Sequence, residues 1–346
     1  MQFLLLLLFL SCLHAEAYGL KNFSFLGEVR LGAIESKDEE ATKATSLALG
    51  ASLGLKTKAF YGVSFTSRLY TTQSLFGKYE EQSFYDSNFE GYTLLGEAFL
   101  SAKISNTNIA IGRQLFESPF LASDDSGMIP LLFEGYSLLN NDLEDSFITL
   151  ASFSKWAGYE SPNAESFHAV QSSTNPIFLA GIHNESLENI ELQAWHYKLD
   201  EANFNYVEVG YENDIFNLGL QYTHQEHQNE AFGVEGEISF KNISFLMAYN
   251  KAKGLVSDGF AGDTFFTTVE KKGIAKTGNK EALKFELVYD ISDFNLALTH
   301  VVFSQNDNET DYHITYAYDE KYAFDLIYAN LYKDGNFLRF VGTLNF

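Results

Sequence analysis

The segment from Asp214 to His224 reads DIFNLGLQYTH and alternates apolar and polar side chains without interruption. Its apolar set is Phe216, Leu218, Leu220 and Tyr222, and its other set is Asn217, Gly219, Gln221 and Thr223. Successive side chains of a β-strand point to opposite faces of the sheet, so a period of two indicates a strand with one apolar and one polar face.

The same period recurs from residue 22 to the last residue, at intervals of about 15–20 residues, whereas helical spacing of apolar residues is scarce. We therefore predict an all-β chain of eighteen strands. The expected strands are 22–35, 44–56, 59–71, 91–104, 108–117, 133–140, 146–155, 176–185, 190–200, 204–213, 215–226, 231–240, 243–252, 281–291, 294–305, 310–320, 322–333 and 336–346.

The connections between these strands alternate between short and long. Short ones include 56–58, 106–108, 213–214, 241–242, 292–293 and 319–321, and long ones lie near 72–90, 118–132, 156–175 and 253–280. This layout is typical of an up-and-down antiparallel meander with tight turns at one end and long loops at the other. All four prolines fall outside the strand interiors, as a closed barrel requires, because proline cannot donate to the ladder.

The apolar faces point to lipid as their neighbour. The longest apolar run, Phe3–Leu10, is well short of the roughly 18 residues of a membrane-spanning helix. The chain has 32 Phe and 20 Tyr, many of them near strand ends, as expected for the aromatic girdles of an outer-membrane barrel. A soluble sandwich would also alternate, but eighteen strands favour a transmembrane β-barrel wide enough for an aqueous channel.

Residues 1–17, MQFLLLLLFLSCLHAEA, are expected to be a signal peptide. An apolar core precedes Ala15-Glu16-Ala17, which has the A-x-A pattern of a cleavage site. Two alternatives stay open, namely lipid attachment at Cys12 and an apolar first strand. Residues 18–346 would then form a single barrel domain without cysteine, so no disulfide can stabilise it. The last strand ends on Phe346, which resembles the insertion signal read by the outer-membrane assembly machinery.

The formal charge of −23, from 23 basic and 46 acidic residues, argues against a nucleic-acid partner, because such proteins carry basic patches. Carboxylates in the expected outer loops, such as those in 37–40 and 78–81, are interpreted as solvated surface. They could also bind divalent ions that bridge lipopolysaccharide, so outer-membrane lipid and lipopolysaccharide are expected partners.

The segment from Ile109 to Glu160 contains a strand ending in Gly-Arg-Gln, then Ser-Asp-Asp-Ser-Gly in a proline-containing loop, then Ile-Pro-Leu-Leu-Phe-Glu-Gly opening the next strand. These features, together with Gly-Asp-Thr-Phe-Phe-Thr at 262–267, resemble the OprD family of outer-membrane porins. The resemblance implies an eighteen-stranded porin whose third and seventh outer loops fold inward, here 118–132 and 253–280. The best-known members of that family line the pore with many arginines, whereas this chain has only Arg30, Arg68, Arg113 and Arg339.

Alternation predicts which charged side chains face the lumen. On the basic side, Arg30, Arg68 and Arg339 are out of phase with lipid-facing residues, and closure places the first and last strands side by side. The expected acidic side and constriction loop comprise Asp124, Asp125, Glu208, Glu235 and Glu237. Two opposed charged walls would set selectivity through a transverse field. Alternatively, these charges pair with one another and only keep the lumen wet.

Enzyme motifs in the chain do not fit the expected fold. The segment 50–54 matches G-x-S-x-G, but that motif needs a strand–turn–helix elbow and here lies within a strand. His224 and His227 have no third ligand nearby in sequence, and no glycine-rich phosphate loop is present. We expect no enzyme, metal or cofactor, and predict a porin for passive diffusion of small polar or charged solutes. The alternative is a non-conducting structural or adhesive barrel; a monomer and a homotrimer both remain open.

Overall fold

The structure is a computed structural model that describes residues 22–40, 42–76, 84–123, 126–200, 202–262, 264–275, 278, 280–305, 307–319 and 321–346. The expected signal peptide, 1–17, and the acidic segment 78–81 lie outside these residues. Within the described chain, none of the helical segments has the length and apolar character needed to cross a membrane.

Eighteen antiparallel strands form the described part of the barrel wall, as the alternation predicted. They are β1 (Phe23–Lys37), β2 (Lys43–Thr57), β3 (Val63–Phe76), β4 (Thr93–Ile104), β5 (Thr107–Gln114), β6 (Leu132–Asn140), β7 (Ser146–Ala157), β9 (Ile177–Leu187), β10 (Ile190–Lys198), β11 (Asn203–Glu212), β12 (Phe216–Gln225), β13 (Asn229–Phe240), β14 (Ile243–Lys253), β15 (Glu281–Ile291), β16 (Phe294–Phe303), β17 (Glu309–Tyr318), β18 (Tyr322–Asn330) and β19 (Asn336–Asn345). A further two-residue strand, β8 (His168–Ala169), pairs with the end of β7 inside a long loop.

The largest boundary errors concern β3, which was expected over 59–71 and spans Val63–Phe76. Tyr61 and Gly62 have positive φ of 49° and 81°, so the chain turns there instead of continuing as strand. Phe60 and Val63 close this turn by hydrogen bonding to each other. The tight turn predicted at 56–58 therefore lies a few residues later.

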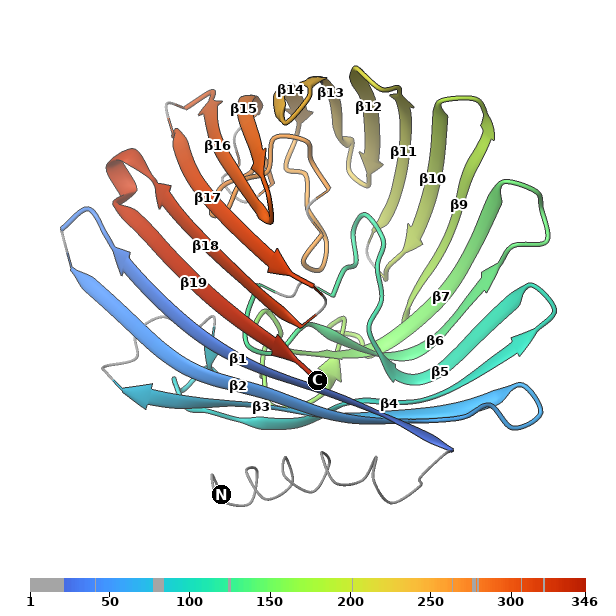
Figure 1. Ribbon diagram of the computed structural model, residues 1–346. Coiled ribbons are helices and arrows are strands. Elements are labelled where there is room, and N and C mark those ends of the chain that lie inside the picture. Colours follow the sequence, from blue (N-terminus) through green and yellow to red (C-terminus); the bar gives the residue numbers. More distant parts are fainter. Residues whose placement is uncertain are drawn as a thin grey trace.

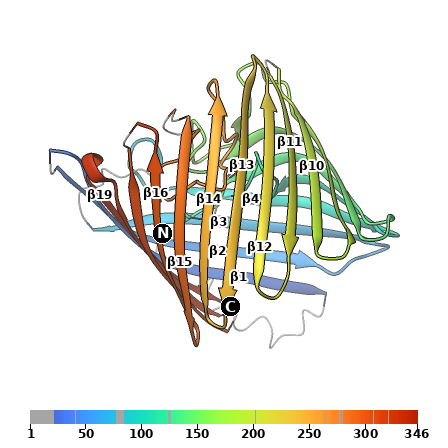
Figure 2. The same cartoon turned by 90° about the horizontal axis from the view of Figure 1, so that it is seen from above.

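The sheet closes on itself, because β1 pairs with both β2 and β19. Figure 1 shows the ring of strands, with β19 beside β1 near the C-terminus, and Figure 2 shows the same ring from a second direction. At the seam the Phe346 N–H donates to the Gly27 carbonyl at 3.0 Å, and the Gly27 N–H donates back to the Phe346 carbonyl at 3.1 Å. Among the described strands of the wall, closure pairs both edges of each one, which is the requirement for a sheet in a membrane.

The outer face of the barrel wall is apolar and the inner face is polar, which is the reverse of the arrangement in a soluble protein. On β12, Leu220 points outward with 57% of its surface exposed, whereas Gln221 and Thr223 point inward and are 5% and 0% exposed. Outward side chains elsewhere are also large and apolar, including Ile111, Ile238, Met247 and Tyr312. An apolar outer surface around a polar interior suits a barrel that sits in lipid.

Two long loops lie inside the ring, as the resemblance implied. We name residues 115–131 loop L3 and residues 254–280 loop L7; Figure 1 shows them within the ring, in teal and orange. The interior core is formed where these loops meet inward aromatic side chains. Phe120 of L3 packs edge-on against Tyr197 of β10 and against Phe204 and Tyr206 of β11, at 5.3–5.8 Å between ring centroids.

Candidate functional site

Loops L3 and L7 are joined by a short parallel bridge between Leu121 and Phe260. The Phe260 N–H donates to the Phe120 carbonyl at 2.8 Å, and the Ala122 N–H donates to the Phe260 carbonyl at 3.1 Å. Gly259 permits this close approach: its φ is +80°, and a Cβ there would lie 2.1 Å from the Phe120 carbonyl oxygen. The two loops therefore cross the lumen as one connected barrier.

Substituting Gly259→Val is expected to separate L3 from L7 and raise the conductance of the pore, because the new side chain collides with backbone and not with a movable side chain. Strain at positive φ adds to the effect. Gly273→Ala is the control in the same loop, since a Cβ at Gly273 would meet Thr268 Oγ1 at an ordinary 3.5 Å. Equal single-channel conductance in both variants would show that the bridge does not narrow the lumen.

The far end of L3 is held against the opposite wall. Arg30 of β1 donates from Nη1 to the Gly127 carbonyl at 3.0 Å. Met128 fills the space over Gly32 of β1 and Gly50 of β2, where an added Cβ would lie 2.4 Å and 3.2 Å from its atoms. L3 thus spans the lumen from β10 and β11 to β1 and β2.

Loop L7 is fixed to the wall at β19 and β14. Its Glu270 forms an ion pair with Arg339 of β19, at 2.7 Å between Oε1 and Nη1. The ammonium of the next residue, Lys271, lies 3.6 Å from the centroid of the Phe337 ring. Asn250 of β14 accepts hydrogen bonds from the backbone N–H and the hydroxyl of Thr267, both at 3.0 Å.

Lys272 attaches L7 to the two neighbouring outer connections. Its side chain is 7% exposed, and its ammonium forms ion pairs with Asp307 and with Asp334, the latter at 2.6 Å. Burial alone would lower the pKa of Lys272, but the two carboxylates outweigh it and raise that pKa above its usual value. In turn, the Lys272 ammonium holds the pKa of Asp334 below its usual value.

Substituting Lys272→Met is expected to weaken the attachment of L7 by about 1–2 kcal/mol, a value reduced by the half-exposed position of Asp334. Amide hydrogen exchange in L7 should then accelerate roughly tenfold.

The same attachment should depend on pH. Because the pKa of Asp334 is depressed, the stability that its ion pair gives to L7 is present above the usual carboxyl pKa and is lost as the pH falls through the lowered value. Wild-type protection should accordingly fall below about pH 4. Protection equal to wild type in Lys272→Met would contradict this attachment; Lys253→Met, which removes an exposed ion pair, is the control.

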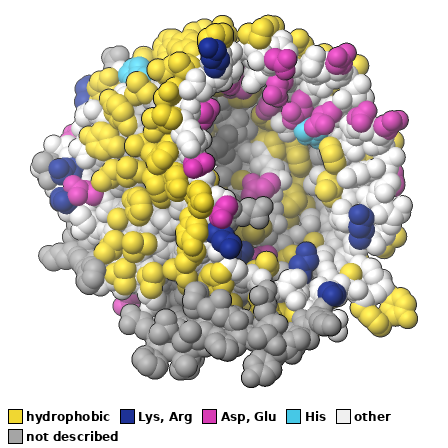
Figure 3. All heavy atoms as spheres, viewed as in Figure 1, with side chains coloured by type: hydrophobic (Ala, Val, Ile, Leu, Met, Phe, Trp, Pro, Cys, Tyr) yellow, Lys and Arg dark blue, Asp and Glu magenta, His cyan; other side chains and the backbone are white. Residues whose placement is uncertain are grey.

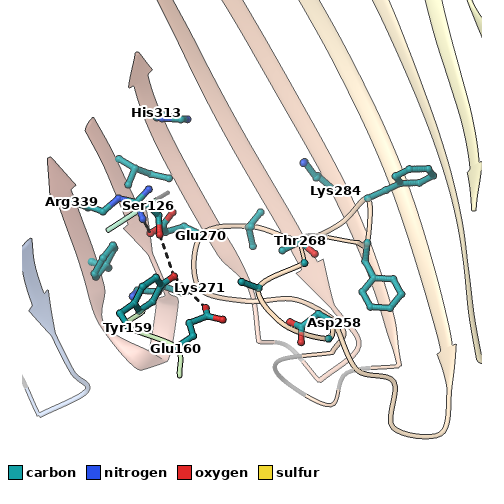
Figure 4. A pocket seen from close by; sticks show the side chains of 18 of the residues that line it. Ser126, Tyr159, Glu160, Asp258, Thr268, Glu270, Lys271, Lys284, His313 and Arg339 are labelled. Atoms are coloured by element: carbon teal, nitrogen blue, oxygen red, sulfur yellow. Dashed lines mark hydrogen bonds and ion pairs between the residues drawn. The ribbon is translucent and has the colours of Figure 1, made fainter. Parts of the chain in front are cut away.

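A cavity of about 720 Å³ lies beside L7 and is lined by charges of both signs. Figure 4 shows Arg339 and His313 extending from strands on one side of it, Lys284 from another strand, and Glu270, Lys271 and Asp258 from L7. Glu235 also lines this cavity, so one member of each predicted wall borders the same space. A smaller cavity of about 340 Å³ continues along Arg30, Asp325 and Arg339.

Each of the three arginines on the expected basic side has a carboxylate beside it. Arg30 lies 2.6 Å from Glu28, Arg339 lies 2.7 Å from Glu270, and Arg68 lies 3.9 Å from Glu97. Asp325 adds a second carboxylate near Arg339, at 3.7 Å. The three arginines are therefore largely compensated by neighbouring carboxylates.

The acidic side has few such partners. Glu208 on β11 is bonded to the Tyr206 hydroxyl, and Glu237 on β13 accepts from the Ser239 hydroxyl at 3.0 Å. A cavity of about 780 Å³ lies along this wall, and its described lining includes no lysine or arginine. Its carboxylates are Glu185, Glu191, Glu208, Glu212, Asp214 and Glu235. Figure 3 shows acidic side chains along part of the rim of the central hollow. Asp124 and Asp125 lie outside the described residues.

Sequence reasoning missed two of the three residues that neutralise the arginines. Glu97 follows Gly96, where the pairing of β3 with β4 shifts register between Arg68 and Leu69. Glu270 lies in a loop without periodicity, so only the folded path of L7 brings it to Arg339. The alternation did place Glu28 on the lumen face, since it lies two residues before Arg30 on the same strand.

The motifs that were set aside as non-catalytic lie where the alternation predicted. Gly50–Gly54 is inside β2, and the hydroxyl of Ser52 accepts from Arg68 Nε at 3.0 Å. His224 is on β12 and His227 is in the following turn. Among the described residues, no group of three or more histidine, cysteine or acidic side chains is arranged to hold a metal.

A family model described as outer membrane porin, OprD family, matches residues 49–321 of this chain. Among solved structures, OpdK of Pseudomonas aeruginosa with vanillate is similar at a TM-score of 0.79 and 14% identity, covering 94% of this chain and 99% of that one. OccAB4 of Acinetobacter baumannii has a TM-score of 0.78 and 14% identity, and OccK8 (OprE) of Pseudomonas aeruginosa 0.78 and 16%; both comparisons cover 94% of this chain and 98% of the other. No curated protein matches the sequence.

Proposed function

Because this chain belongs to the OprD family of outer-membrane porins, we propose that its selectivity is set where L7 brings Arg339 and Glu235 to the border of one cavity. As a porin of the outer membrane, it is a channel for passive diffusion of small polar or charged solutes, and L3 and L7 narrow its lumen. The arrangement of charge around that cavity is the observation that carries the proposal.

The proposed roles follow the two sides of the lumen. Arg30, Arg68 and Arg339 form the basic side, and Glu208, Glu235 and Glu237 form the acidic side, to which the sequence also assigns Asp124 and Asp125. The three arginines have carboxylates within 4 Å, whereas the described lining of the acidic cavity contains no lysine or arginine, so the net field in the lumen favours cations. We accordingly propose that solutes bearing an amino or guanidino group pass faster than anions of equal size.

This preference is testable on the purified protein. The reversal potential in a KCl gradient should have the sign of cation selectivity, and liposome swelling should be faster with cationic amino acids than with carboxylates or sugars. Glu208→Gln combined with Glu235→Gln should lower the preference, because both changes remove a charge without changing side-chain size. An anion-selective wild-type channel would contradict the proposed sign and leave the porin function intact.

The aromatic OpdK ligand named above, vanillate, bears a carboxylate. A preference for cations would distinguish this channel from a channel of the same fold that prefers carboxylates. Vanillate added to the swelling panel provides the direct comparison: entry slower than that of a cationic amino acid supports the proposal, and faster entry contradicts it.

Several further assignments belong to the same proposal. We propose cleavage after Ala17, a single barrel domain over 18–346, and no catalytic activity. Phe346, whose backbone closes the seam with Gly27, is the proposed signal to the assembly machinery. Lipopolysaccharide is the proposed neighbour of the outer loops, and the proposed assembly is a monomer or a homotrimer.

A further inference from the structure

Two buried carboxyl groups of β17 hold loop L7 by consecutive backbone amides. The Lys271 N–H donates to Glu309 Oε1 at 2.9 Å, and the Glu270 N–H donates to Asp311 Oδ2 at 3.2 Å. Glu309 is 0% exposed and Asp311 is 4% exposed. These bonds fix the segment that carries Glu270 to Arg339, so the position of the L7 charge at the cavity depends on them.

The remaining oxygens of the pair are orphaned. Within the described structure, Glu309 Oε2 and Asp311 Oδ1 are buried and accept no hydrogen bond from a donor group. Glu309 and Asp311 alternate with Thr310, so they share one face of the strand, and their carboxyl groups are within hydrogen-bonding reach of each other. Two adjacent buried carboxylates cannot both be ionised without a large cost, whereas one shared proton satisfies both orphaned oxygens.

Other charges near the pair do not replace that proton. Those on elements packed around it are Glu270, Lys271 and Lys272 on L7, Asp307 and Asp334 on the outer connections, Lys284 and Glu286 on β15, His313 on β17, Asp325 on β18 and Arg339 on β19. Most of the cations are already engaged: Arg339 pairs with Glu270, Lys284 with Glu286, and Lys272 with Asp307 and Asp334.

We propose that Glu309 and Asp311 are positioning residues that form a proton-bridged clamp on L7, so that protonation of the pair controls how far the loop narrows the lumen. The inference rests on the proposed function, since it concerns the size of a conducting pore. With one proton shared between the carboxyl groups, both backbone amides of L7 keep their hydrogen bonds and Glu270 keeps its ion pair with Arg339. When the proton is lost, two like charges face each other in a buried space, the clamp loosens and the lumen widens.

Docking of L7 can be measured without recording current. Gly273 is buried in L7, and a Cβ there would meet only an ordinary contact with Thr268, so Gly273→Cys introduces a shielded thiol. In a chain also carrying Cys12→Ser, this is the only thiol. At pH 7 its reaction with a membrane-impermeant maleimide should be slow, and at least tenfold faster when Glu309→Ala and Asp311→Ala are combined. Glu309→Gln should remain slow, because the amide supplies the bridging hydrogen permanently.

The pH profile separates a clamp from a merely structural role. Wild-type conductance should rise between neutral and alkaline pH, whereas Glu309→Gln should stay at its neutral value throughout. Glu230→Gln, which changes a carboxyl of β13 that is bonded to Tyr222 and Lys253, is the matched control and should keep the wild-type profile. If the double-alanine protein does not assemble, Asp311→Ala alone serves as the loosened form.

The clamp is overturned if thiol labelling is equal in all variants, or if Glu309→Gln and wild type share one pH profile. A wild-type protein without current steps would instead contradict the proposed function. Labelling of the Gly273→Cys protein would still report whether Glu309 and Asp311 hold L7, so the two failures are distinguishable.

Discussion

Replacing both Arg68 and Arg339 by glutamate is expected to shift the reversal potential in a KCl gradient strongly toward cations. The double change removes two positive charges from the lumen wall and adds two negative ones, beside Glu97 and Glu270 that would lose their partners. Unit charges 4 Å apart in water interact by about 1 kcal/mol, which corresponds to roughly fivefold in a permeability ratio for each unit of charge changed. The reversal potential of single channels measures the effect directly.

The matched control is Lys251→Glu combined with Lys253→Glu. It changes the formal charge of the protein by the same amount, but on exposed side chains at the end of β14. An unchanged reversal potential in the Arg68/Arg339 variant would refute the assignment of these residues to the pore wall. An equal shift in both double variants would show that total charge, and not the lumen, sets selectivity.

Introducing arginine at Leu220 is expected to block assembly of the barrel or to lower its stability by about 2–4 kcal/mol. Leu220 lies in the middle of β12 and points outward, so its replacement places a charge in hydrocarbon. Asn217→Arg, three residues earlier on the same strand, is the control. Asn217 lines the acidic cavity and is opposite Glu212 and Glu237 in the neighbouring strands, so an arginine there meets water and carboxylates.

Heat-modifiable gel mobility and insertion into vesicles report the outcome. Leu220→Arg should lose the compact folded band, while Asn217→Arg should keep it. Normal assembly of both proteins would contradict the placement of lipid on the outward face of β12.

The wall of the barrel was readable from sequence because one physical rule governs every strand. Lipid outside and water inside impose opposite polarity on alternate positions, so β12 and β13 carry the pattern without help from distant residues. The pattern failed at Tyr61 and Gly62, where left-handed backbone ended a run that still looked like strand. It also could not locate register shifts, such as the one opposite Gly96.

The constriction was only partly readable, since it is built by loops that follow no period. Alternation placed Arg30 and Arg339 on neighbouring strands, but the carboxylates that compensate Arg68 and Arg339 depend on a register shift and on the path of L7. Glu309 and Asp311 look like ordinary lumen positions in the sequence. Their role is evident only from the folded structure, in which backbone amides of L7 donate hydrogen bonds to them.

We infer that L3 and L7 narrow the lumen of this closed barrel but leave a continuous water-filled path through it. Recording purified protein in a planar lipid bilayer tests that claim most directly. The structure predicts discrete current steps of uniform size that persist at constant voltage. A protein that inserts fully and assembles into the heat-modifiable form, yet gives no steps, would contradict the open channel and favour the alternative of a plugged structural barrel.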